Sequence, residues 1–173
     1  MPKTTELVAF DRELHTACGA VGRPFLCDGS PFGCEIFLVG INPGTDTPFW
    51  PFWSVGDGCD KAAWLKKYLD RHGHLGPTRK RIERLFKSAH PARVLETNVF
   101  HRSSKREAAL LREHQTTKVF DFLLKTLHPR VMFVYGDSAV KHLAKLTNCS
   151  LQLSKFTPVQ YQGHKFDIIY ICA

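Results

Sequence analysis

The chain has no hydrophobic run long enough to cross a membrane, because no stretch approaches the roughly 18 apolar residues that a spanning helix needs. Its first residues, Met-Pro-Lys-Thr-Thr-Glu, lack the apolar core of a secretory signal. Its six cysteines include no C-x-x-C pair, the spacing typical of metal-binding and redox modules. We therefore expect a cytoplasmic protein with reduced cysteines, no membrane partner, no metal and no cofactor.

The sequence also lacks a P-loop and an obvious cluster of carboxylates, the features with which nucleases and phosphotransferases hold Mg²⁺. These absences disfavour both classes of enzyme. With 173 residues, 43% of them hydrophobic, the chain has enough material for its own core. We expect one domain covering residues 1–173.

Positive charge is concentrated in one part of the chain. The formal net charge is +8, and residues 61–106 hold 13 Lys and Arg against 3 Asp and Glu. A one-sided excess of this kind favours contact with the phosphates of a nucleic acid. The alternative is a pair of solvated basic helices anchored by their apolar faces.

Helical and extended patterns alternate along the chain. Continuous apolar or β-branched runs, typical of strands buried on both faces, cover residues 35–41, 94–100, 131–136 and 167–172. Helical spacing covers residues 5–17, 60–72, 78–90, 105–127 and 138–147. This order predicts an α/β fold, a three-layer α/β/α sandwich around a central four-stranded parallel sheet.

Two helix starts carry a predicted cap. Thr78 is the expected N-cap of its helix, with Arg79, Lys80 and Arg81 exposed beyond it. Asp137 is expected to cap the helix that follows Gly136.

Residues 40–44, Gly-Ile-Asn-Pro-Gly, directly follow the apolar run 36–39 and predict a sharp loop at the carboxyl end of a buried strand. Ligands bind at such ends in open parallel sheets, and glycine lets the backbone approach a ligand closely. Taken alone, the same residues are equally typical of an ordinary turn. Residues 47–55 add four aromatic side chains between prolines, some of which we expect to line a pocket.

Residues 40–44, together with the aromatic-Ser-Val segment that follows, resemble the first active-site motif of the uracil-DNA glycosylase superfamily. The Asn-Pro-Gly form is similar to the mismatch-specific and single-strand-selective branches, whereas another branch has Asp for Asn and Tyr for the last Gly. Three further segments agree in order, residues 94–99, 131–139 and 166–173. The resemblance spans about residues 35–173 and implies a monomeric, metal-independent enzyme that acts on DNA.

Carried onto this sequence, the resemblance implies a role for each motif residue. Asn42 would be catalytic, because a neutral amide can orient water towards C1′ of the sugar without acting as a strong base. Asn98 would read the polar edge of a flipped pyrimidine, and Trp53 would stack on it, which is worth about 1–3 kcal/mol. The full expected set is Asn42 and His101 as catalytic residues; Gly40, Ile41, Gly44, Phe52, Trp53 and Asn98 around the base; and Arg79, Lys80, Arg81, Arg102 and Lys105 on the DNA.

The family's second motif, a His-Pro-Ser or Asn-Pro-Ser loop after the last strand, has no counterpart in the 173 residues. We expect either that the chain was shortened or that other side chains replace the loop, with His101, Arg102 and His164 as candidates for the second case. Some branches of the superfamily carry an iron-sulfur cluster, but the scattered spacing of the cysteines here favours unliganded thiols.

Gly44 bears on the substrate, because a tyrosine at this place blocks substituents on the pyrimidine 5-position. The expected reaction is hydrolysis of the N-glycosidic bond of uracil or a 5-substituted pyrimidine. A first alternative is excision of bulky, glucosylated hydroxymethylcytosine from phage DNA, as antiviral defence. A second, of a different class, is a DNA-binding module without catalytic activity.

Overall fold

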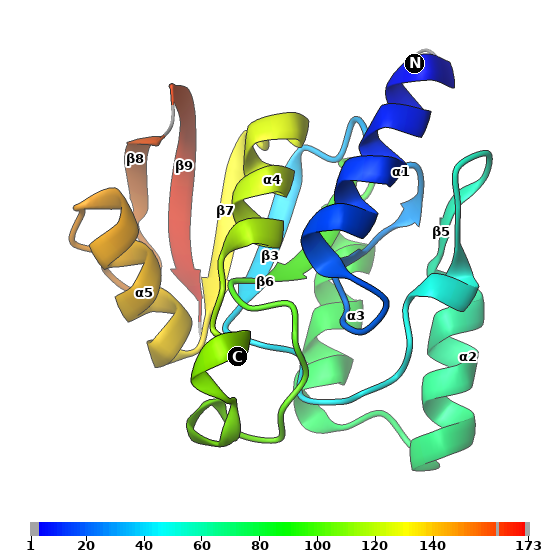
Figure 1. The fold of residues 1–173 in the computed structure, drawn as a ribbon. Coiled ribbons are helices and arrows are strands. Elements are labelled where there is room, and N and C mark those ends of the chain that lie inside the picture. Colours follow the sequence, from blue (N-terminus) through cyan, green and yellow to red (C-terminus); the bar gives the residue numbers. More distant parts are fainter. Residues whose placement is uncertain (1–3, 162, 172–173) are drawn as a thin grey trace.

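The computed structural model describes residues 4–161 and 163–171 and has a mostly parallel central sheet with helices packed against it (Figure 1). The sheet has six strands in the order β1-β6-β3-β7-β9-β8. These strands are β1 (Phe25–Leu26), β3 (Ile36–Gly40), β6 (Val94–Asn98), β7 (Val131–Tyr135), β8 (Phe156–Tyr161) and β9 (His164–Ile171). The chain is therefore an α/β protein, as the sequence predicts.

The four predicted strands form the parallel centre of this sheet. β3 pairs in parallel with both β6 and β7, and β7 pairs in parallel with β9. The last strand begins at His164, three residues before its predicted start, and Cys172 at its predicted end lies outside the described residues.

The prediction of a four-stranded parallel sheet was wrong in the number of strands, because an antiparallel strand extends the sheet at each edge. β1 pairs with β6 over two residues, and β8 forms a hairpin with β9. A two-residue strand leaves no pattern in a sequence. β8 contains Pro158, which argues against a central strand but is tolerated at an edge, where a backbone donor is not needed.

A second, small sheet stands beside the first. It comprises β2 (Asp28–Gly29), β5 (Gly58–Asp60) and β4 (Trp53–Ser54), all antiparallel. Gly58 has a φ of 82°, and a Cβ at this position would lie 2.2 Å from the carbonyl carbon of Gly29. Only glycine allows the two backbones to meet there.

The five α-helices of the described residues lie near their predicted places, with one exception. They are α1 (Thr4–Cys18), α2 (Lys61–His72), α3 (Pro77–Ala89), α4 (Lys118–Leu127) and α5 (Asp137–Thr147). Three single 3₁₀ turns are η1 (Trp50–Phe52), η2 (Glu107–Ala109) and η3 (Arg112–His114). The predicted helix over 105–127 was wrong in its first half. In residues 105–117 only Leu110 is buried, so this segment has no apolar stripe to hold a helix on the core.

Both predicted caps were wrong. α3 begins at Pro77, with Gly76 before it and no side-chain cap, so Thr78 lies inside the first turn. Asp137 is the first residue of α5, and its carboxylate accepts a hydrogen bond from the Tyr170 hydroxyl at 2.7 Å.

Alternate strand residues face the helices on the two sides of the sheet. Phe37 and Val39 belong to the main core, together with apolar residues of α1, α4 and α5. Leu38 and Val94 point the other way, towards Ile82 of α3. Figure 1 shows α1 and α4 side by side on one face. Burial on both faces explains why the strands are continuous apolar runs.

One group of charges lies inside the protein. The carboxylate of Glu96, in the middle of β6, is only 1% exposed and accepts hydrogen bonds from Arg23 at 2.9 Å and Arg79 at 2.5 and 2.7 Å. Both guanidinium groups also lie over the ring of Trp64, at 5.1 and 5.2 Å. Burial alone would raise the pKa of Glu96, but the two arginines outweigh it and lower the pKa to about 2.

Arg79 is therefore not the exposed DNA-binding residue that was predicted. It is 7% exposed, and both of its partners, Glu83 and Glu96, hold it in the interior. The partner in β6 is 17 residues away along the chain, and no local pattern indicates it.

We predict that Glu96→Gln lowers the free energy of unfolding by about 3–5 kcal/mol, because it leaves two buried guanidinium groups without their carboxylate. Denaturant titration at neutral pH measures this loss. The matched control is Glu35→Gln, which removes the exposed ion pair with Arg130 and should cost about 0–1 kcal/mol. Equal losses of stability in the two variants would contradict a structural role for the buried ion group of Glu96, Arg23 and Arg79.

Candidate functional site

The loop after β3 and the segment after β6 run side by side at the carboxyl edge of the sheet. Backbone hydrogen bonds join Val99 to Gly40 at 2.9 Å, Phe100 to Ile41 at 2.8 Å, and Ser104 to Pro43 at 2.9 Å. In Figure 1 both segments lie at the lower edge of the molecule, with the α2–α3 connection. This arrangement brings the motif residues Asn42 and Asn98 to the same edge, as expected for neighbouring parallel strands.

The orientation of the Asn42 amide is fixed by its partners. Its nitrogen donates to two carbonyl oxygens, those of Ser104 at 2.8 Å and Pro43 at 3.1 Å. Because a carbonyl can only accept, the nitrogen must occupy this side, and Oδ1 points away from the loop. Oδ1 has no donor among the described residues. A half-buried acceptor is thus held in place at the mouth of the loop.

Asn98 is the last residue of β6, and its side chain is 2% exposed. Neither Oδ1 nor Nδ2 has a hydrogen-bond partner in the described part of the chain. A Cβ on Gly40 would lie 2.9 Å from Asn98 Oδ1 and 2.6 Å from the Tyr135 hydroxyl, so glycine leaves room for both groups. Leaving a buried polar group unpaired costs about 1–3 kcal/mol, which makes this amide a candidate for binding a ligand.

A cavity of about 200 Å³ opens at this edge, between residues 20–23, residues 45–50 and Ser103. Phe49 lines it and is fully buried, and Thr47 contributes a hydroxyl with no partner among the described residues. Ile41 and the exposed Gly44 belong to the adjoining loop. No described atom lies within 4 Å of a Cβ built on Gly44, so the space beside it is open.

Phe49, which the sequence reasoning did not single out, lines the cavity where Trp53 was expected. The Trp53 indole donates to Asp11 at 2.7 Å, stacks on Phe49 and touches the ring edges of Phe25. Trp53 is therefore partly buried and packs against the main core, outside the described residues that line the cavity. Phe52 also packs against the main core. The run contains two Phe–Trp pairs separated by a proline, so the sequence gives no signal that distinguishes the residue lining the cavity from those packed against the core.

His101 is buried directly after the strand that ends at Asn98. It forms a hydrogen bond with the backbone of Cys18, and Nδ1 has no partner in the described residues, so Nε2 is the donor. Burial, and then the nearby Arg102, lower the pKa of His101 to about 4. The imidazole is therefore neutral near pH 7, with an acceptor nitrogen free and its N–H already used.

Arg102 and His114 line a second cavity, of about 310 Å³, beside His101. The Arg102 guanidinium donates to the Val21 carbonyl at 2.5 Å and lies 3.5 Å from His114. It is half-buried and remains at the carboxyl edge of the sheet. Lys80, Arg81 and Lys105 are exposed, as predicted.

His164 does not belong to this site. It is the first residue of β9, and its ring packs against that of His128, with the centroids 3.8 Å apart and the planes tilted by 30°. The amino ends of parallel strands lie at the opposite edge from their carboxyl ends, so the prediction that His164 replaces the second motif was wrong.

Three cysteines that are scattered in the sequence meet in the interior. The thiol of Cys27 donates to the Gly29 carbonyl at 3.3 Å and lies beside the thiols of Cys34 and Cys59, and all three are buried. Interactions among the three thiols raise the pKa of Cys27 and lower those of Cys34 and Cys59. All are free thiols. In the part of the chain that the structure describes, no group of three or more His, Cys, Asp or Glu side chains is arranged to hold a metal ion.

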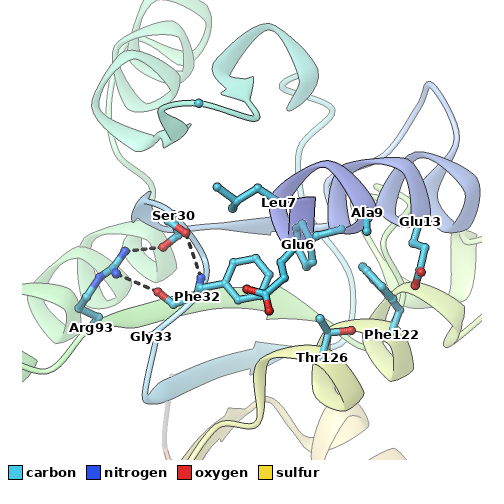
Figure 2. Close-up of a pocket in the computed structure, with 12 residues that line it drawn as sticks. Glu6, Leu7, Ala9, Glu13, Ser30, Phe32, Gly33, Arg93, Phe122 and Thr126 are labelled. Carbon is cyan, nitrogen blue, oxygen red and sulfur yellow. Dashed lines mark hydrogen bonds between the residues drawn. The ribbon is translucent and has the colours of Figure 1, made fainter. Parts of the chain in front are cut away.

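A larger cavity, of about 990 Å³, lies at the amino edge of the sheet (Figure 2). Its apolar wall consists of Phe10 of α1, Phe122 of α4, and Phe32 from the segment between β2 and β3. The guanidinium of Arg93, which lines this cavity, is already hydrogen bonded, because it donates to the carbonyl oxygens of Asp28, Ser30 and Phe32. This cavity is separate from Asn42 and Asn98, which lie at the carboxyl edge of the sheet.

A scan against protein-family models finds no match for this chain, and a search of curated proteins finds none either. None of the helices in residues 4–161 and 163–171 is both long and apolar enough to span a bilayer.

We predict that His101 makes the protein lose stability in acid. Its pKa is about 4 when folded and 6.5 when exposed, so the folded state resists protonation, and stability falls as the pH drops from about 6.5 to about 4. The loss is about 3 kcal/mol. Urea titrations across this range should show a loss that is larger by this amount in the wild type than in His101→Gln, which keeps a donor for Cys18. His142, whose pKa burial also lowers, is present in both proteins. Parallel pH profiles would contradict the prediction.

Proposed function

We propose that this protein is a DNA glycosylase with a uracil-DNA glycosylase-like layering of its sheet and helices, which hydrolyses the N-glycosidic bond of a flipped pyrimidine. One observation carries the proposal. A buried amide without a partner, Asn98, ends one parallel strand, beside a loop in which a second amide, Asn42, presents only its oxygen.

Asn42 supplies the water. Its Oδ1 accepts a hydrogen bond from a water and directs one lone pair of that water to C1′ of the sugar. An amide removes no proton at this stage, so the reaction depends on a dissociative transition state, in which the base leaves as an anion and the sugar becomes an oxocarbenium ion. The water oxygen then bonds to C1′, and the proton that the water loses passes to the anionic base. Rigid positioning of the water is then the main contribution, and the two carbonyl partners of Asn42 provide that rigidity.

Asn98 holds the base. Its amide offers one donor and one acceptor, the pair needed for the carbonyl and N–H edge of a uracil-type ring. A flipped base that satisfies both atoms recovers the free energy lost by leaving them unpaired in the interior.

The buried ions support departure of the base as an anion. Arg23, Arg79 and Lys61 face Glu83 and Glu96, which gives three positive against two negative charges. Tyr135 lies between this group and Asn98. Its hydroxyl is close to Gly40 and to the Asn98 amide, and burial, followed by the charge of Glu96, raises the pKa of that hydroxyl. A net positive charge in a dry interior stabilises negative charge that develops nearby.

Gly44 bears on the choice of base. The open space beside it imposes no wall on the 5-position, so we propose uracil or a 5-substituted pyrimidine as substrate. Bulky glucosylated hydroxymethylcytosine, with a role in antiviral defence, is the extreme member of this series.

We predict that Asn42→Ala abolishes base release and leaves folding and DNA affinity intact. The test incubates wild type and variant with oligonucleotides that carry a single uracil, mismatched thymine, 5-hydroxymethylcytosine or its glucosylated form, and scores alkali-labile abasic sites. The loss should be about 100-fold or more, since positioning contributes several kcal/mol. Gln152→Ala, an exposed amide on a loop, is the matched control and should be fully active. DNA binding without release from any substrate would instead favour a non-catalytic DNA-binding module.

We predict opposite effects of Asn98→Leu on stability and activity. Leucine has a similar shape and removes two unpaired polar atoms, so the free energy of unfolding should rise by about 1–2 kcal/mol. Base release should fall to background, because nothing reads the base edge. Thermal unfolding and the abasic-site assay measure the two effects on the same sample. A destabilised variant would show that the amide has a structural role.

A further inference from the structure

A groove of about 720 Å³ lies between α2 and α3, and neither Asn42 nor Asn98 is among the described residues that line it. Its apolar floor comes from Leu65, Leu75 and Phe86. Lys61 also lies on this floor, but its ammonium group is 3.9 Å from the centre of the Phe86 ring and bonds to Glu83 at 2.5 Å. The charges of Lys61 and Glu83 therefore cancel inside the groove.

Three exposed cations of α3 follow one wall of the groove, Lys80, Arg84 and Lys87. At about 100° per residue, these positions fall within an arc of about 60°, so they form a single stripe along the helix. None of the three forms an ion pair within the described part of the chain. Among the described residues that line the groove, Asp28 at its far end is the one exposed anion.

The spacing of this stripe matches a nucleic-acid backbone. From Lys80 to Lys87 the helix rises about 10 Å, at about 1.5 Å per residue. One DNA strand places a phosphate about every 3.4 Å along the axis of a duplex, and a free strand can follow the same path. Three cations over this length can therefore neutralise about three phosphates.

The groove is also directed towards the site. α3 precedes β6 and packs against it through the Arg79–Glu96 pair, and the amino end of α3 lies at the carboxyl edge of the sheet, near Asn98. Figure 1 shows the α2–α3 connection at that same edge. A strand bound along α3 reaches the base site from Lys80.

We propose that the groove between α2 and α3 binds a single strand of DNA, with its phosphates on Lys80, Arg84 and Lys87 and its bases or sugars over the apolar floor. Single-strand sites combine basic and apolar groups in this way. A duplex carries two rows of phosphate and is too stiff to place its bases on the floor of a groove of this size. The inference rests on the proposed function only in its choice of DNA as the partner.

The test measures binding to an unmodified oligodeoxyadenylate of about 15 nucleotides by fluorescence anisotropy, at salt concentrations between about 50 and about 200 mM. The variant is Lys80→Glu/Arg84→Glu/Lys87→Glu. Its matched control is Lys125→Glu/Lys141→Glu/Lys155→Glu, which changes the net charge equally at exposed positions on other elements. Circular dichroism checks that both remain folded.

The groove variant should bind at least about tenfold more weakly at low salt, and the slope of log K against log salt should fall by about 2, as three lost contacts require. The control should keep the wild-type slope. Equal losses in the two variants, or none in either, would overturn the proposal. So would an equal loss on blunt duplex DNA, or competition by poly-glutamate as strong as that by DNA. Because the probe contains no excisable base, failure of the glycosylase proposal leaves this result unaffected.

Discussion

The carboxylate of Glu96 fixes the interior of this protein, because two buried guanidinium groups depend on it. Arg23 comes from the segment before β1 and Arg79 from α3, so the ion group joins two distant segments to the middle of β6. Neither arginine can leave without stranding a charge, which is strongly unfavourable in the interior. Asn98 lies two residues further along β6 and points to the same face of the sheet as Glu96. The depth at which the Asn98 amide is held therefore follows from where the ions hold the strand.

Unpaired polar atoms gather at the carboxyl edge of β3 and β6. Of the five buried atoms without a partner in the described chain, four are Thr47 Oγ1, His101 Nδ1 and the two amide atoms of Asn98; the fifth is Trp64 Nε1, beside the ions. Stable cores avoid such atoms, because each costs about 1–3 kcal/mol. Their concentration beside one loop is the pattern expected where stability is given up for ligand binding. Among the described residues, the large apolar cavity at the amino edge has none of these unpartnered atoms, and backbone carbonyls satisfy the polar groups of Arg93 there.

Local patterns in the sequence predicted the four parallel strands and most helices, because burial on both faces and helical spacing are properties of neighbouring residues. The carboxyl-edge position of Asn42 and Asn98 followed from chain order alone. Features that depend on distant partners were missed. Arg79 adds to the basic composition of residues 61–106, but it is buried, because it pairs with Glu96 in β6. Trp53 packs against Phe10 and Phe25, which come from other parts of the chain. Residues 105–117 have helical propensity but no apolar face, so propensity alone overestimated their order.

The distribution of charge is more informative than its sum. Residues 61–106 carry 13 Lys and Arg, but Lys61 and Arg79 are neutralised inside the protein, and Arg93 is bound to backbone carbonyls at the amino edge. These three cations stabilise the fold and contribute little to attracting a polyanion. The exposed cations that remain are ordered by the helix on which they lie, and α3 is held against β6 by the same ion group that sets the depth of Asn98. The groove and the candidate base site are thus coupled through one structural element, so a strand bound by the first would reach the second without a rearrangement of the core.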